Sequence, residues 1–178
     1  MNRSLVLSAM AALSLAVGAP VLAQPPPAPS TAAAPSTSDF ITAAAQTDDF
    51  ERQSGRIAEH SSHRQRVRTF GAMMVADHTK TTEHLKAAIH KAGLTAPSPH
   101  LTNIQIQMLN ALRLSIAKPL FDHTYIDQQV SVHRQALALM QSYAEHGENA
   151  TLRAAAANIV PIVQHHLAVA EAIQKSVD

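Results

Sequence analysis

Four residues of metal-binding types lie on rows that a helical spacing would bury. They are Glu51, His78, His133 and His166. Each stands in a row of apolar or small residues spaced three and four positions apart, as on one face of an α-helix. Buried ionisable groups cost free energy unless they are paired or bound to a metal. Imidazole and carboxylate ligands suit Zn, Fe or Cu, so the pattern raises the hypothesis of a transition-metal site inside a helical bundle.

Further metal ligands, or groups that orient the histidines through hydrogen bonds to the other ring nitrogen, could be Asp77, Asp122 and Tyr125. The same side chains also fit a structural network of hydrogen bonds that fixes how the helices pair. The chain contains no Glu-x-x-His pair, which carboxylate-bridged di-iron bundles use, and no His-x-x-x-His pair. The sequence therefore favours the structural network and keeps the metal site as the alternative.

Distances along the expected helices also argue against one shared site. Glu51 lies about 10 residues from the first short turn and His78 about 16, an offset of ~9 Å. His133 and His166 differ by about four residues from the second turn, or ~6 Å. The larger offset strains a single shared site, so two histidine-containing pairs at different levels, or one buried polar network, fit at least as well.

Helical periodicity extends over nearly all of the chain after the first 37 residues. No run of alternating β-branched residues competes with it, so the fold class is all-α. Ser62 with Gln65 predicts a capping box at the start of the second helix. The expected helices cover residues 39–60, 62–92, 98–116, 119–146 and 149–175.

Short connections predict that the first two helices form an antiparallel hairpin, and the last two another. The shorter third helix would carry the chain back along the second one. Two antiparallel pairs joined by a long crossover make a ferritin-like four-helix bundle.

The N-terminus predicts export. Residues 1–23 combine Arg3 with an uncharged apolar run that ends in Val-Leu-Ala, which is typical of a cleaved signal peptide. An uncleaved anchor is the alternative. Residues 24–37, rich in Pro and Ala, predict a linker, and the bundle domain is expected at 38–175. We thus expect a periplasmic or secreted protein, and because the chain has no cysteine, no disulfide stabilises it.

Charge and composition exclude several classes of function. The chain has 14 Lys and Arg against 13 Asp and Glu, and loss of residues 1–23 removes only Arg3, which leaves a neutral domain. Nucleic acids and anionic membranes need a positive field, so neither is an expected partner, and the mature chain has no expected membrane span. No nucleophile elbow or phosphate-binding glycine loop occurs, which argues against an enzyme.

Four stretches carry a resemblance to a known family. They are "AAAQTDDFERQSGRIA", "MMVADHTKTTEHLK", "LFDHTYIDQQVSVHRQAL" and "PIVQHHLAVA". In this order they resemble the bacterial envelope family called domain of unknown function 4142, over roughly residues 38–173. The resemblance implies a ferritin-like fold and an envelope location, and no reaction.

Together these features predict an exported helical bundle that acts as a non-catalytic envelope binding or structural module. Its partner would be another envelope protein or a second copy of the chain. The alternative is a metal-binding protein that holds Fe, Zn or Cu at the Glu and His residues inside the bundle.

Overall fold

A computed structural model describes residues 35–98 and 100–177. The signal peptide expected at 1–23, and most of the linker expected at 24–37, lie outside the described residues. The helices of the described part are α1 (Thr37–Ser61), α2 (Gln65–Lys91), α3 (Asn103–Ser115), α4 (Phe121–His146) and α5 (Ala150–Val177). The predicted all-α class is confirmed, and no strand occurs in the described part.

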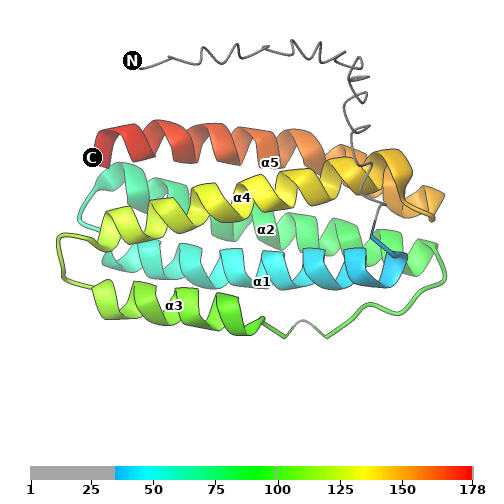
Figure 1. The fold of residues 1–178 in the computed structure, drawn as a ribbon, viewed down its shortest axis with the longest axis horizontal. Coiled ribbons are helices and arrows are strands. Elements are labelled where there is room, and N and C mark those ends of the chain that lie inside the picture. The colour runs from blue at the N-terminus through cyan, green and yellow to red at the C-terminus, as the bar shows by residue number, and fades with distance from the viewer. Residues whose placement is uncertain (1–34, 99, 178) are drawn as a thin grey trace, which may run out of the picture. The chain divides into compact units, whose positions relative to one another are not determined.

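The long helices form two antiparallel hairpins, α1 with α2 and α4 with α5 (Figure 1). Helix α2 packs on α5 and α1 on α4, so the two hairpins form a four-helix bundle. Helix α3 lies outside against α1 and α4, and it carries the chain back so that α2 and α4 run parallel (Figure 1). This is the crossover topology expected from the sequence.

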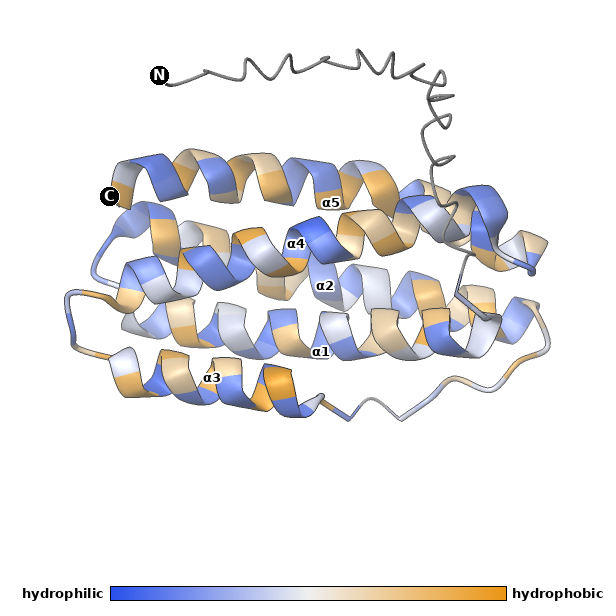
Figure 2. Ribbon diagram, in the orientation of Figure 1, coloured by the Kyte–Doolittle hydropathy of each residue, from blue (hydrophilic) through white to orange (hydrophobic). Residues whose placement is uncertain are grey.

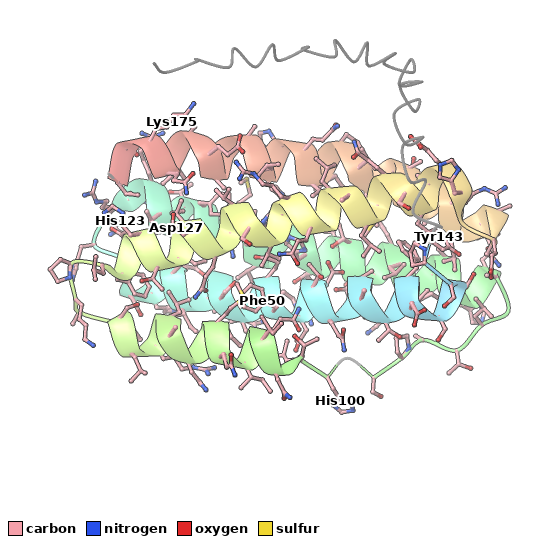
Figure 3. All side chains as sticks on the ribbon, viewed as in Figure 1. Phe50, His100, His123, Asp127, Tyr143 and Lys175 are labelled. Atoms are coloured by element: carbon pink, nitrogen blue, oxygen red, sulfur yellow. The ribbon has the colours of Figure 1, made fainter. Side chains whose placement is uncertain are left out.

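Hydrophilic and hydrophobic residues alternate along the helices, as the amphipathic pattern requires (Figure 2). The apolar faces form two separate clusters. One surrounds Tyr143, which lies near the end of α4 (Figure 3). Tyr143 stacks on Phe40 with ring centroids 3.8 Å apart and shares a hydrogen bond with Thr37 at the start of α1. The other surrounds Tyr125 and Phe70. We call them the Tyr143 core and the Tyr125 core. None of the described helices is both long enough and apolar enough to span a membrane.

Two helix starts differ from the sequence-based prediction. The predicted capping box of Ser62 and Gln65 is wrong, because α2 begins at Gln65 after Arg64, without a side-chain cap. Ser62 instead donates to Asp122 across the end of the bundle, 2.6 Å away, and accepts from the backbone N–H of Arg64. Asp122 thus holds the α1–α2 turn against α4.

Helix α3 is shorter than predicted. Thr102 caps it in a full capping box with Gln105, so the helix begins at Asn103 rather than near Ser98. Its buried face consists of Leu109, Leu112 and Ser115, and Ile104 is 69 % exposed. An outer helix needs only a narrow apolar stripe, because it packs on the bundle from one side.

Close contact between α1 and α2 depends on two glycines. A Cβ on Gly71 would lie 2.6 Å from the carbonyl oxygen of Gly55 and 2.9 Å from the backbone nitrogen of Glu59. A Cβ on Gly55 would lie 2.7 Å from the carbonyl oxygen of Gly71. These backbones touch where a side chain would force the helices apart.

Gly71→Ala therefore destabilises the protein by about 1–3 kcal/mol through overpacking, although alanine is the better helix former. Denaturant unfolding of the variant measures the loss. Gln107→Ala, at an exposed position of α3, is the control that leaves stability within about 0.5 kcal/mol of wild type. A Gly71→Ala protein more stable than wild type would contradict the packing described.

Candidate metal centre

A layer of buried polar side chains separates the two apolar cores. It contains Glu51, His78, Gln129, His133 and His166, each at most 4 % exposed. We call this set the histidine layer. All five residues lie near the middle of their helices, so the layer is closed at both ends by apolar packing.

The structure brings the three predicted histidines together. The ring centroids of His78, His133 and His166 are 5.4–5.8 Å apart. One nitrogen of each ring lies within 4.8 Å of a nitrogen of each of the other two. The expectation of pairs at different levels is therefore wrong for these histidines.

The offsets predicted from the sequence were too large, because they were counted from predicted helix ends that differ from the observed ones. Glu51 lies ten residues before Ser61 and His78 thirteen after Gln65, so their offset is three residues, or ~4.5 Å. His133 lies thirteen residues before His146 and His166 sixteen after Ala150, which is the same offset. Side-chain length and helix tilt bridge this distance.

Each histidine is held from behind by an acceptor. Asp48 Oδ1 accepts from His78 Nδ1 at 2.8 Å, and the backbone carbonyl of Gln129 accepts from His133 Nδ1 at 2.9 Å. Asp77 Oδ2 accepts from His166 Nε2 at 3.2 Å. Because these partners are acceptors, they place a proton on the bonded nitrogen and leave the other nitrogen with a free lone pair.

The three remaining nitrogens, His78 Nε2, His133 Nε2 and His166 Nδ1, are buried and have no hydrogen-bond partner. A buried acceptor without a partner costs about 1–3 kcal/mol. Three such acceptors lie in this one layer. Imidazoles held by a carboxylate or carbonyl from behind are the usual arrangement of metal ligands.

Asp48 was missed in the sequence analysis, although it is the partner of His78. Its carboxylate also accepts from Thr81 at 3.0 Å and from Thr82 at 2.9 Å, which fixes its orientation. Asp48 lies thirteen residues before Ser61, the same depth as His78 after Gln65. Equal distance from the shared turn was the signal that could have found it.

Glu51 lies in the layer but outside the three-nitrogen group. Its Oε1 is 3.7 Å from His133 Nδ1, and neither carboxylate oxygen has a hydrogen-bond partner. Burial raises the pKa of Glu51 to about 7, against the opposing charge of His78. Near neutral pH Glu51 is therefore only partly ionised, and a cation bound beside it would favour its charged form.

The other predicted site residues occupy different places. Asp77 holds His166 and also pairs with Lys80 at 3.1 Å; burial works to raise its pKa, but these partners lower it overall. Tyr125 is buried in the Tyr125 core, where burial and the charge of Glu51 raise the pKa of its hydroxyl. The structure does not bring Asp122 to the layer, because Asp122 bonds Ser62 at the end of the bundle.

The three histidines differ in their readiness to take a proton. Burial works to lower the pKa of His78, but the hydrogen bond and charge of Asp48, together with Glu51, raise it overall. Burial and the charge of His78 lower the pKa of His133 to about 3 and that of His166 to about 4. Without a metal, a single proton on His78 is therefore the competing occupant of the site.

The pKa of His133 predicts a loss of stability in acid. Its folded pKa of about 3 lies below the ordinary value of 6.5, so the unfolded chain binds more protons between these values. The stability that neutral His133 contributes is complete above about pH 6.5 and is lost as the pH falls toward 3. The expected loss from this residue is up to about 1.4 kcal/mol per pH unit.

Denaturant unfolding at several pH values, in the presence of a chelator, measures this slope. His133→Leu removes the titrating group, so its unfolding free energy falls less steeply below about pH 6.5 than that of wild type. Equal slopes in the two proteins would show that His133 is not buried as a neutral imidazole.

A search with protein-family models matches residues 22–173 to the family described as "Domain of unknown function (DUF4142)". The match spans all of the histidine layer and both hairpins up to residue 173. No curated protein and no solved structure matches the chain. The resemblance carried by the four sequence stretches is thereby confirmed: the chain belongs to the DUF4142 family.

Proposed function

We propose that the protein binds one transition metal ion through His78, His133 and His166. The observation behind the proposal is that three buried histidines each place one nitrogen within 4.8 Å of a nitrogen of the other two, and each has one ring nitrogen without a hydrogen-bond partner. Three lone pairs in a medium of low dielectric repel one another and call for a cation. A metal ion satisfies all three at once.

The spacing is compatible with coordination after a small movement. A point equidistant from three atoms 4.8 Å apart is ~2.8 Å from each, whereas a zinc–nitrogen bond is about 2.0–2.1 Å long. If each ring rotates so that its nitrogen moves by less than about 1 Å, the three nitrogens reach this bonding distance. The three ligands come from α2, α4 and α5, so the metal would also join the two hairpins.

The donor set favours Zn²⁺ or Cu²⁺, because it offers imidazole nitrogen and no thiolate. Glu51 would offset part of the positive charge, or reach the ion as a fourth ligand. A cavity of about 10 Å³ adjoins His78 and Asp48, which is room for about one water molecule. Because the three histidines are each at most 4 % exposed, their site fits the retention of an ion better than the turnover of a substrate.

We further propose that the protein acts outside the cytoplasm, as the apolar run at residues 1–23 indicates. Metal binding in the cell envelope would combine the two hypotheses drawn from the sequence, a binding module and a metal protein.

A purely structural polar layer is the second candidate. The raised pKa of His78 favours it, because a proton on Nε2 could donate to a neighbouring imidazole. In that case the layer fixes the pairing of the hairpins and no metal is required. The two candidates differ in metal content and in the response of stability to metal.

The proposal predicts about one metal ion per chain in protein purified without a His tag or chelator. Added Zn²⁺ raises the melting temperature of metal-free wild type, because a ligand that binds only the folded state stabilises it. Elemental mass spectrometry and calorimetric titration measure the two effects. His133→Ala with His166→Ala removes two of the three ligands and abolishes both.

His165→Ala is the matched control for these measurements. His165 is the exposed neighbour of His166, and its loss leaves metal content and affinity unchanged. Metal-free wild type that gains no stability from Zn²⁺ or Cu²⁺ would instead support the structural layer. Equal metal content in wild type and the double variant would place the metal at surface histidines.

Asp48→Asn tests the group behind His78. The amide weakens the acceptor that fixes the tautomer and orientation of His78, so Zn²⁺ affinity falls about 10- to 100-fold. Asp49→Asn is the control, since Asp49 pairs with Arg52 at 3.0 Å and makes no bond to a histidine. Equal affinities of the two variants would exclude Asp48 from the site.

A further inference from the structure

A second cavity lies on the outer side of Asp48, between α1 and α2. Its volume is about 340 Å³, within the range of small-molecule sites. One part of its wall is apolar and is formed by Ala45, Leu85, Ile89, Ala96 and Pro97. No residue of the histidine layer lines this cavity, but Asp48, which does line it, bonds His78.

The polar part of this cavity carries an excess of free positive charge. Arg52 and Arg56, one helical turn apart on α1, line it together with Lys86 of α2. The side chains of Arg56 and Lys86 make no hydrogen bond or ion pair with the described residues. Of the two acids in the wall, Asp48 is already bonded to His78, Thr81 and Thr82, which leaves only exposed Glu83.

Two hydrogen bonds fix the side chain of Arg52 at the wall of the cavity. One terminal nitrogen donates to Thr82 Oγ1 at 2.6 Å and the other to Asp49 Oδ1 at 3.0 Å. The side chain is 19 % exposed, so its position is fixed by these bonds and by packing. Two of its five N–H groups are used, and the others remain free to bind an anion.

From this combination we infer that the cavity binds a small organic carboxylate. The carboxylate pairs with Arg52 and Arg56, because a guanidinium matches the two oxygens of a carboxylate. The hydrocarbon part packs on Leu85, Ile89 and Pro97. Inorganic phosphate would satisfy the arginines but leave this apolar wall unused. The inference does not depend on metal binding at the histidines.

Titration of the purified protein with hexanoate, followed by amide NMR, tests the inference. We expect saturable shifts that gather at Ala45, Arg52, Thr82 and Ile89. Hexanol has the same hydrocarbon chain without the charge, and its affinity is expected to be at least about tenfold lower than that of hexanoate. Inorganic phosphate, which has the charge without the chain, is also a weaker ligand.

Arg56→Gln removes a cation that makes no side-chain bond, so the fold is preserved and hexanoate affinity falls about tenfold. Lys86→Gln gives a second variant with the same expected direction. Arg66→Gln is the matched control, since exposed Arg66 lies on α2 outside the cavity. Absence of saturable hexanoate binding, equal binding of hexanol, or wild-type affinity in Arg56→Gln and Lys86→Gln would overturn the inference.

Discussion

The structure depends on how three buried imidazoles are satisfied at the centre of the bundle. One nitrogen of each ring is bonded to an acceptor on its own hairpin or on the facing one, and the other is buried without a hydrogen-bond partner. Apolar packing on both sides prevents water from reaching this layer freely. The fold therefore carries the cost of three buried acceptors without partners, which other interactions or the cation proposed above must offset.

The remaining parts of the bundle hold this layer in place. The Gly55 and Gly71 contact brings α1 and α2 close enough for Asp48 to reach His78. Asp77 extends from α2 to His166 on α5 and so connects the two hairpins. Helix α3 covers α1 and α4 from outside and contributes nothing to the layer. The site is thus built from the four long helices, and its geometry follows from their pairing.

Much of the fold could be predicted from the sequence, because long amphipathic helices and short turns leave few arrangements. The candidate ligands were found in the same way, since His78, His133 and His166 break otherwise apolar rows. Their meeting in one layer was not predicted, because an error of three residues in a helix start shifts the depth by ~4.5 Å. Ser62 is an example. Its spacing from Gln65 predicts a helix cap, but its hydroxyl bonds Asp122, which is distant in sequence, and the helix begins at Gln65.

The partners of the histidines were harder to predict than the histidines themselves. Asp122 and Tyr125 lie on α4, as His133 does, but eleven and eight residues away along the helix. Proximity in sequence therefore gave no contact, whereas Asp48 lies thirty residues from His78 and bonds it directly. Tertiary pairing decides which carboxylate holds which ring, and a single sequence contains that information only through equal distances from a shared turn.

X-ray absorption spectroscopy of the protein loaded with one equivalent of Zn²⁺ tests the central claim most directly. We expect a first shell with three imidazole nitrogens at about 2.0 Å, and a spectrum that changes when His133 is replaced. A shell of oxygen ligands that is the same in wild type and the His133 variant would contradict it. So would a protein that retains no zinc.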